Sequence, residues 1–465
     1  MQDGEGAGRG VTGGPAAAIV VGGGLAGSEA AWQIAEAGHR VRLFEMRPKV
    51  TTRAHNTDRL GELVCSNSLK SLVPTSAPGI LKSELRRLGS VVLAAAESAR
   101  IEAGTALTVD RDVFSRTITE RVTAHPRIEV VRDEVAAIPE RGPAVIATGP
   151  LTSDALSASL RDLFGRDALY FYDAIAPIVT RESLDLSRLF AAARYDKGEG
   201  SFLNAAMTEA EYGAFHEALT SADVFPLKKF ERGQFFQGCL PIEDLAYRGR
   251  ETLAFGPMRP VGLIDPRTGG RPHAVVQLRP ENAAGTCYSL IGCQSRLTIS
   301  EQRRVFRMIP GMAAAEFLRY GSLHRNTYLA SPLLLTPTLQ TRVRPDLLLA
   351  GQITGVEGYL ESTAMGLLAG RSVVGLLGEG RGVVPPRETA LGSLVAYITE
   401  TRPSRFQPMN INMGLFPEVA GRRLSRDARD ARVAERASGA LERWLAGGLA
   451  ADAPRAPLDP LASAS

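Results

Sequence analysis

The chain has 465 residues, 44% of them hydrophobic, a formal net charge of +4 and four cysteines. This length can hold two or three domains, and the ordinary hydrophobic content excludes a mainly disordered chain. The cysteines are too few and too far apart for a disulfide framework or a metal motif, so we expect no bound metal. Without a long apolar run or a secretion signal, we expect a cytoplasmic protein with no membrane association.

The first motif in chain order combines a strand, a glycine turn and a helix. Ala17 to Val21 is an apolar run typical of a buried parallel strand, and Ser28 to Ala37 has helical apolar spacing. The glycines between them follow the G-x-G-x-x-G spacing of a dinucleotide-binding turn, in which the positive helix end faces a pyrophosphate. The predicted nucleotide-binding residues are Gly22, Gly23, Gly24, Leu25, Ala26 and Gly27.

The next predicted strand, Arg40 to Phe44, leads directly to Glu45. A carboxylate roughly 20 residues after such glycines accepts hydrogen bonds from a ribose. Glu45 therefore favours an adenosine with a free 2′-hydroxyl, as in FAD or NAD, over NADP.

A second glycine-rich stretch follows another predicted strand, Asp346 to Ala350. Two such stretches suggest one flavin held at both ends, with the amino end of a helix over Ser362 to Leu377 facing it. The residues predicted to bind FAD from this stretch are Gly351, Thr354, Gly355, Glu357 and Gly358.

The alternation of strand and helix patterns predicts an α/β fold, namely a Rossmann-like FAD-binding domain with an inserted mixed α/β domain. The FAD-binding domain comprises residues 16–190 and 328–446, and it includes a buried strand at Ala144 to Pro150 and a helix over Leu424 to Leu445. Residues 191–327, rich in aromatics and in Gly–Pro loops, form the inserted domain. We expect a disordered leader over residues 1–15 and a disordered tail over 447–465.

Two cysteines are candidates for catalysis. Cys65 follows the ribose-binding strand, so topology places it at the carboxyl edge of the sheet, near a flavin. Cys239 lies in the inserted domain between Gly238 and Pro241, which indicates a turn that exposes its thiol. Cys287 and Cys293 are interpreted as small buried hydrophobic residues.

Several long motifs resemble the folate- and FAD-dependent tRNA (uracil-5-)-methyltransferase family. The resemblance extends from about residue 16 to 445 and keeps the order of the motifs. They are residues 55–71, 195–199, 238–243, 252–263, 324–327, 351–359 and 406–412.

The resemblance implies a mechanism and its participants. In this family, 5,10-methylenetetrahydrofolate supplies a one-carbon unit, reduced FAD takes part in its transfer, and NADH or NADPH reduces the flavin. The product is 5-methyluridine in the tRNA T loop, and we expect no obligate protein partner. Cys239 matches the thiol that attacks carbon 6 of uracil. Cys65 matches the second cysteine, a base for the carbon 5 proton or a partner in adduct handling.

The resemblance also implies that the inserted domain, residues 191–327, lies on the RNA and folate side, and it suggests residues for both ligands. A pterin stacked on the flavin needs a second planar face, and His324 is preferred over His55 for it. The target uridine must be unstacked from its loop. The residues expected to hold RNA phosphates are Arg325, Lys197, Lys228 and Lys229.

Other functions remain open at this point. The same chemistry could act on a ribosomal RNA uridine. A flavin oxidoreductase with two redox thiols is a second alternative, although neither Cys65 nor Cys239 lies in a C-x-x-C motif. A third is a non-catalytic tRNA-folding role with a structural flavin.

Overall fold

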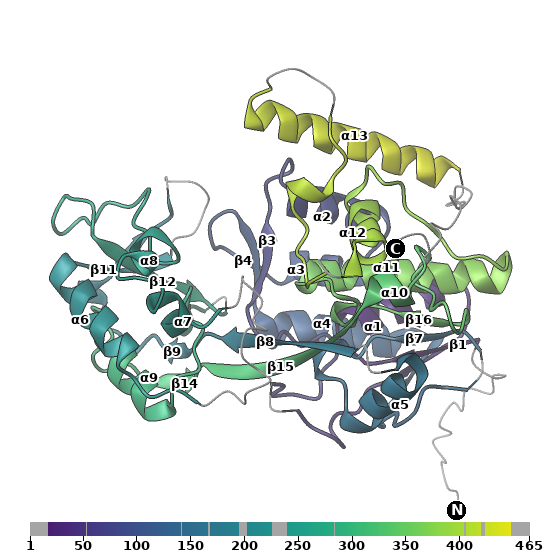
Figure 1. The fold of residues 1–465 in the computed structure, drawn as a ribbon, viewed down its shortest axis with the longest axis horizontal. Helices are drawn as coiled ribbons and strands as arrows, with labels where there is room; N and C mark the ends of the chain where they lie inside the picture. The colour runs from purple at the N-terminus through teal and green to yellow at the C-terminus, as the bar shows by residue number, and fades with distance from the viewer. Residues whose placement is uncertain are drawn as a thin grey trace, which may run out of the picture.

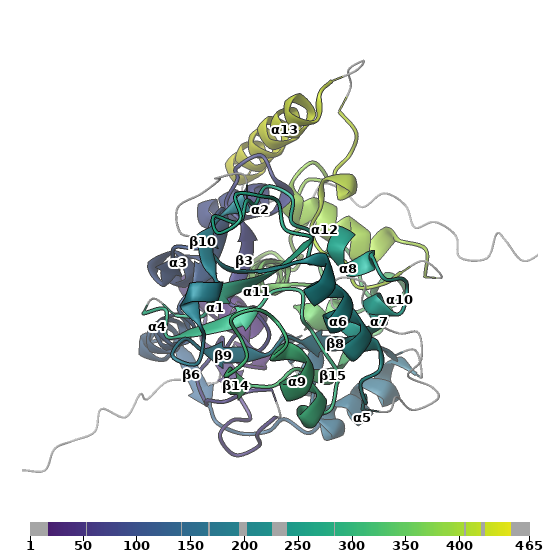
Figure 2. The ribbon, with the colours of Figure 1, turned by 90° about the vertical axis from the view of Figure 1, so that its left-hand side faces the viewer.

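The computed structural model describes residues 17–52, 54–140, 142–165, 168–194, 202–225, 240–282, 284–403, 406–419 and 424–447, with the backbone alone at 168–175 and 322–327. The leader over residues 1–15 lies outside the described residues, as does the tail after Gly447. The described part forms two lobes connected by a long two-stranded ribbon (Figure 1), and Figure 2 shows the molecule with the smaller lobe toward the viewer.

The larger lobe is built on a parallel sheet of five short strands in the order β16-β7-β1-β2-β6. Its strands are almost entirely apolar because helices cover both faces. This arrangement confirms the predicted α/β fold with a Rossmann-like sheet. The strands are β1 (Ala18–Val21), β2 (Val41–Phe44), β6 (Ile128–Val131), β7 (Ala144–Ile146) and β16 (Leu347–Leu349).

Helices of this lobe pack on the sheet and on one another, with α5 on one face and α1 and α11 on the other. They are α1 (Leu25–Glu36), α2 (Ala77–Arg87), α3 (Val91–Ser98), α4 (Arg111–Ala124), α5 (Asp154–Phe164), α10 (Ser331–Leu334), α11 (Tyr359–Gly378), α12 (Ala390–Glu400) and α13 (Arg426–Ala446). No helix in the described ranges is long and apolar enough to cross a membrane.

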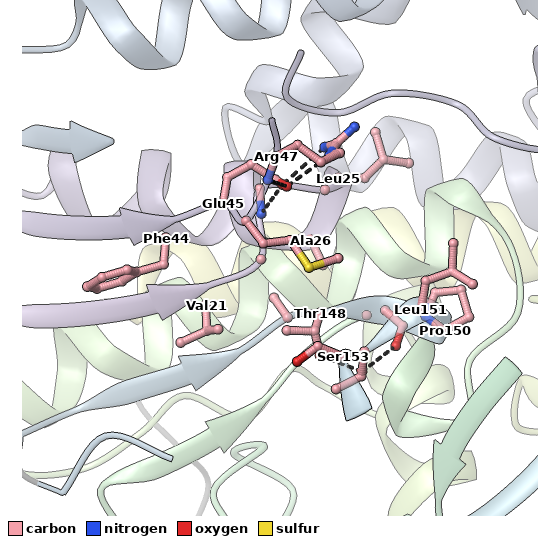
Figure 3. Close-up of a pocket in the computed structure, with 18 of the residues that line it drawn as sticks. Val21, Leu25, Ala26, Phe44, Glu45, Arg47, Thr148, Pro150, Leu151 and Ser153 are labelled. Carbon is pink, nitrogen blue, oxygen red and sulfur yellow. Dashed lines mark hydrogen bonds and ion pairs between the residues drawn. The ribbon is translucent and has the colours of Figure 1, made fainter. Parts of the chain in front are cut away.

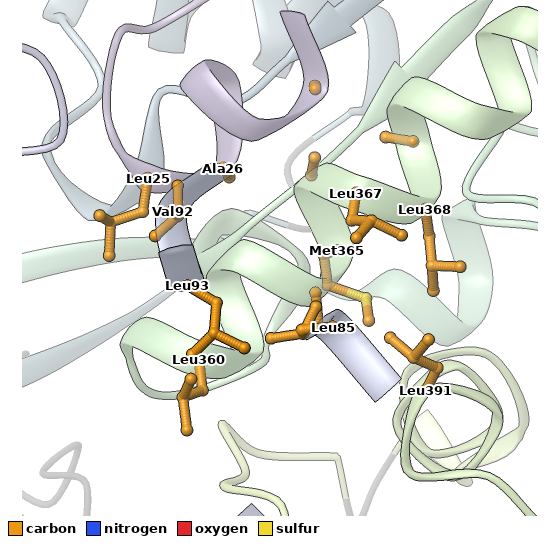
Figure 4. Close-up of a cluster of buried hydrophobic side chains, with 14 of the residues drawn as sticks. Leu25, Ala26, Leu85, Val92, Leu93, Leu360, Met365, Leu367, Leu368 and Leu391 are labelled. Carbon is orange, nitrogen blue, oxygen red and sulfur yellow. The ribbon is translucent and has the colours of Figure 1, made fainter. Parts of the chain in front are cut away.

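Glycines allow α1 and α11 to approach closely. A Cβ at Gly366 would lie 2.2 Å from the carbonyl oxygen of Ala26, and one at Gly370 would lie 2.7 Å from that of Ala30. Around this contact, leucines and Met365 form the main hydrophobic core (Figure 4). The packing brings the amino ends of both helices to the same edge of the sheet.

The smaller lobe contains a six-stranded sheet whose pairings are all antiparallel. Its strands are β9 (Ile178–Thr180), β10 (Phe190–Ala192), β11 (Phe202–Met207), β12 (Ala274–Pro280), β13 (Cys287–Leu290) and β14 (Phe317–Arg319). Its helices are α6 (Glu209–Thr220), α7 (Ile242–Ala246), α8 (Thr252–Phe255) and α9 (Ile299–Phe306). The sheet begins at Ile178, so the expected division at residue 191 falls inside β10.

The connecting ribbon pairs β8 (Ala168–Ile175) with β15 (Ser322–Leu329) in antiparallel register. A small antiparallel sheet lies on the side of the larger lobe that faces the smaller lobe (Figure 1). It consists of β3 (Ser68–Ser71), β4 (Arg100–Ile101) and β5 (Ala106–Val109). Short 3-10 turns also occur at η1 (Gly149–Leu151), η2 (Leu186–Arg188), η6 (Gln352–Thr354) and η8 (Met413–Leu415).

Candidate functional site

A cavity opens at the carboxyl ends of the parallel strands, where α/β sheets bind ligands. Figure 3 shows Glu45 and Arg47 on one side of it and Thr148 and Ser153 on the other. Its walls combine segments from β1, β2 and β7 with the start of the second glycine stretch. The lining residues are Val21 to Ala26, Phe44 to Arg47, His55, Glu62, Val64, Asp133 to Val135, Ala147 to Ser153, Leu156, Gly351, Gln352, Tyr359 and Ser362.

The amino end of α1 is suited to a diphosphate. Its N-cap residue, Gly24, provides no side chain to cap the helix, so the first backbone N–H groups remain available. A Cβ at Gly24 would meet no atom within 4 Å, whereas one at Gly22 would lie 2.6 Å from the carbonyl oxygen of Ala147. Gly22 therefore serves the turn, and Gly24 leaves space on the ligand side. Gly23, Leu25 and Ala26 line the cavity as well, while Gly27 is absent from its lining.

Glu45 lies at the cavity but is already fully paired. One carboxylate oxygen accepts from the Arg47 backbone N–H at 3.0 Å and Nε at 2.8 Å, and the other accepts from Gly23 N–H at 3.1 Å and Arg47 Nη2 at 3.0 Å. Burial opposes ionisation, but these bonds and the charge of Arg47 hold the pKa of Glu45 below its ordinary value. The four contacts occupy the acceptor positions of a carboxylate. A ribose hydroxyl would therefore have to replace one of them, and ribose binding by Glu45 stays a prediction.

Only part of the second glycine stretch reaches the cavity. Gly351 lines it, and a Cβ there would lie 2.8 Å from Ala26 Cβ, so the two glycine-rich stretches meet. The other four predicted residues of this stretch are absent from the lining: Thr354, Gly355, Glu357 and Gly358.

Those residues instead build the loop before α11. The Gly355 carbonyl oxygen accepts from the Met409 N–H at 3.1 Å, and the φ of +84° at Gly355 and its contact with Phe406 leave no space for a side chain. Glu357 accepts a hydrogen bond from Gln352 Nε2 at 2.6 Å. The segment around Met409 thus fixes the loop that ends at Tyr359.

Cys65 lies near the cavity, on the loop that follows Val64. Its backbone N–H donates to the Tyr359 hydroxyl at 2.8 Å, and its carbonyl oxygen accepts from Arg111 Nη2 at 2.8 Å and Arg319 Nη2 at 2.9 Å. Since Val64 and Tyr359 both line the cavity, the structure brings Cys65 beside the predicted cofactor site. Its side chain is half-buried.

Several predicted residues cannot be placed in the site. Cys239, Lys197, Lys228 and Lys229 lie outside the described residues. His324 and Arg325 have a described backbone only, in β15 opposite Asp173 and Tyr172. His55, the alternative to His324, lines the cavity, and its Nδ1 lies 2.7 Å from Thr52 Oγ1.

Two residues of the site were not singled out from the sequence. Arg47 is 3% exposed at its side chain and holds Glu45. Tyr359 connects the second glycine stretch to Cys65. Arg47 follows Glu45 by two residues on the same turn, so the sequence alone offers it as a charge partner for that carboxylate. No local pattern connects Tyr359 to residue 65.

Comparisons with known proteins identify relatives both in sequence and in fold. The sequence matches the model of the glucose inhibited division protein A family over residues 17–380. GidA of Aquifex aeolicus, in the form II crystal, has the same fold with a TM-score of 0.67 at 17% identity, over 92% of this chain and 73% of that one.

Curated relatives are closer in sequence. The methylenetetrahydrofolate--tRNA-(uracil-5-)-methyltransferase TrmFO of Bacillus licheniformis is 54% identical over 90% of this chain and 96% of its own length. The protein of the same name from Geobacter sulfurreducens is 54% identical over 92% of this chain and 99% of its own length. The chain therefore belongs to the glucose inhibited division protein A family and, within it, groups with the methylenetetrahydrofolate--tRNA-(uracil-5-)-methyltransferases.

Proposed function

We propose that this protein transfers a one-carbon unit from 5,10-methylenetetrahydrofolate to carbon 5 of uridine in the tRNA T loop, forming 5-methyluridine in the cytoplasm. The observation that carries the proposal is the 54% identity, over almost the full length, to relatives named for this reaction. The cavity beside Cys65 supports it because the reaction needs a bound cofactor next to a reactive thiol.

The residues around the cavity fit FAD. The amino end of α1, with open space at Gly24, suits its diphosphate, and the contact between Gly351 and Ala26 places a second glycine turn beside the first. When FAD is bound and reduced by NADH or NADPH, it supplies the electron pair that converts the one-carbon unit to a methyl group. The proposed contacts with FAD are Gly22 to Ala26, Glu45 and Gly351, and the proposed role of Gly27, Thr354, Gly355, Glu357 and Gly358 is to shape the two turns that carry those contacts.

The two cysteines carry the chemistry on uracil. The Cys239 thiolate adds to carbon 6, and the electron pair displaced from the ring makes carbon 5 nucleophilic. Carbon 5 then forms its bond to the one-carbon unit, while the bond between that unit and the nitrogen that carries it breaks. Cys65 takes the proton from carbon 5, and the bond between sulfur and carbon 6 breaks to return Cys239 as a thiolate. Cys239 is thereby regenerated, and Cys65 returns to a thiolate when it releases the proton to solvent.

Substrate recognition uses the face between the lobes. His324 is proposed to stack on the pterin, and the proposed phosphate contacts are Arg325, Lys197, Lys228 and Lys229. His324 and Arg325 belong to β15, a strand of the ribbon that connects the two lobes.

The test is covalent trapping with a tRNA transcript that contains 5-fluorouridine. Fluorine cannot leave carbon 5 as a proton does, so the bond between sulfur and carbon 6 persists after transfer. The wild-type holoenzyme, with methylenetetrahydrofolate and NADH, should form a gel-stable adduct. Cys239→Ala should form none, and Cys287→Ala, the matched control, should form it normally.

Two results would contradict the proposal. An adduct that persists in Cys239→Ala would assign the nucleophile to another residue. An adduct with ribosomal RNA but not with tRNA would keep the chemistry and change the substrate.

A further inference from the structure

Three arginines from different parts of the chain meet beneath the loop that carries Cys65. Arg111 is the first residue of α4 in the larger lobe, whereas Arg279 and Arg319 belong to β12 and β14 of the smaller lobe (Figure 1). All three interact electrostatically with the Cys65 thiol. The cluster therefore forms only when the two lobes are joined as in this structure.

Two of these arginines hold the Cys65 loop by its backbone. Arg319 donates from Nη1 to the carbonyl oxygen of Val64 at 3.0 Å and from Nη2 to that of Cys65 at 2.9 Å. Arg111 donates from Nη2 to the same Cys65 oxygen at 2.8 Å and from Nη1 to the Leu63 carbonyl oxygen. Because the guanidinium fork is planar and rigid, these four bonds fix the position of residues 63–65.

The cluster holds more positive than negative charge. In the described ranges, its ion pairs involve one carboxylate, Glu281, which is 3% exposed, pairs with Arg111 and lies 3.9 Å from Arg279. The side chains of Arg111 and Arg279 are only 20% and 14% exposed. Burial, together with the neighbouring charge of Arg111, lowers the pKa of both Arg279 and Arg319. Three buried cations beside one carboxylate favour a second anion.

We propose that Arg111, Arg279 and Arg319 are positioning residues that hold the Cys65 loop and keep the Cys65 sulfur as a thiolate, the second anion of the cluster. The Tyr359 hydroxyl, from the start of α11, is a further titratable group that interacts with this thiol. The inference deepens the proposed function, since only the thiolate can accept the proton of carbon 5.

Burial dominates the pKa of the other described cysteines, although Arg111 also acts on Cys287 and lowers its pKa. Burial and the neighbouring Glu281 carboxylate raise the pKa of Cys287, and burial raises the pKa of Cys293 to about 12. They serve as internal references in one experiment.

The test measures alkylation of the holoenzyme by iodoacetamide between pH 5 and 10, with each cysteine quantified by mass spectrometry. For Cys65 the midpoint of the rate should lie at least about one unit below the ordinary thiol value of about 8.5. Arg319→Gln should raise that midpoint by about one unit, which makes the reaction about tenfold slower at lower pH. Arg319→Lys keeps the charge and should keep the midpoint within about half a unit.

Two further variants separate charge from structural damage. Arg307 also donates twice to a carbonyl oxygen, that of Ala315, so Arg307→Gln is the matched control and should leave the Cys65 midpoint unchanged. Glu281→Gln removes the competing carboxylate and should lower the midpoint. A loosened loop cannot explain shifts of opposite sign in Arg319→Gln and Glu281→Gln.

A wild-type midpoint near 8.5, or an Arg319→Gln midpoint equal to the wild-type one, would overturn the inference. If Arg319→Gln does not fold, Arg279→Gln replaces it, because the described contacts of Arg279 are charge interactions with Glu281, Arg111 and the Cys65 thiol. Alkylation needs neither folate nor RNA. A failure of methyl transfer would therefore leave this result intact, and the two proposals fail separately.

Discussion

The backbones of Gly366 and Ala26 are in direct contact, so that a Cβ at Gly366 would lie 2.2 Å from the Ala26 carbonyl oxygen. This contact sets the distance between α1 and α11, and both helices begin at the cavity. A larger side chain at position 366 of α11 would therefore change the shape of the predicted cofactor site.

We expect Gly366→Ala to destabilise the protein by roughly 1–3 kcal/mol, because the methyl group forces the two helices apart. It should also weaken FAD binding. Gly378→Ala, at the exposed end of the same helix with no neighbour within 4 Å, should change stability by less than about 1 kcal/mol. Urea denaturation and flavin titration measure both effects. Equal stability of the two variants would show that the contact between Gly366 and Ala26 does not limit how closely the two helices pack.

Gly24→Asp should lose bound FAD while the protein remains folded. The new side chain points into open space, so it disturbs no packing, but its charge repels a diphosphate at the helix end. Gly24→Asn has nearly the same size and no charge, and it should retain more flavin. Absorbance of the purified proteins near the flavin bands measures occupancy. Full yellow colour in Gly24→Asp would contradict the assignment of this turn.

The sequence predicts a structural element well when the residues that determine it lie close together in the chain. The strand at Ala18–Val21 and the helix after it were expected because their apolar spacing and glycines lie within a few residues of one another. The helix begins at Leu25 rather than at Ser28, since the turn closes directly after Gly24. Likewise α11 begins at Tyr359, directly after the glycine at 358.

Contacts between distant segments were not predictable in this way. The arginines at Cys65 come from residues 111, 279 and 319, and only the joining of two lobes brings them together. The prediction that Cys287 is a small buried residue was wrong in part, because it is half-buried and Asn282 Nδ2 lies 3.7 Å from its sulfur. Cys293 is fully buried, as expected.

Glu45→Gln should cost about 3 kcal/mol of stability, because it leaves Arg47 buried beside a neutral amide. The exposed pair of Arg42 and Glu129 joins neighbouring strands of the same sheet and is the matched control. Glu129→Gln should cost less than about 1 kcal/mol. Chemical denaturation of the flavin-free proteins compares them. A similar loss of stability in Glu45→Gln and Glu129→Gln would mean that burial does not increase the contribution of the Glu45–Arg47 pair.

The buried amine of Lys82 should make the stability of the folded protein depend on pH. Its amine donates to the Ser71 carbonyl oxygen at 2.7 Å, and burial lowers its pKa to about 7 from the ordinary value of 10.5. Between these values the unfolded chain binds more protons than the folded one, so this contribution to stability rises with pH and is lost as pH falls through about 7. The slope is at most about 1.4 kcal/mol per pH unit.

Lys82→Met should lack this slope, so its stability relative to wild type should improve as the pH falls from 9 to 6. Lys49→Met removes an exposed lysine and should keep the wild-type slope. The free energy of unfolding at pH 6, 7.5 and 9 decides the question. Parallel curves for wild type and Lys82→Met would show that Lys82 stays charged in the folded protein.

The central claim is tested most directly by following the carbon from folate to RNA. The holoenzyme is incubated with NADH, an unmodified tRNA transcript and methylenetetrahydrofolate that carries deuterium on its methylene, and the nucleosides are analysed by mass spectrometry. We predict deuterated 5-methyluridine in the tRNA and none when S-adenosylmethionine is the only donor. Methylation from S-adenosylmethionine alone, or no deuterated 5-methyluridine in the tRNA, would contradict the account.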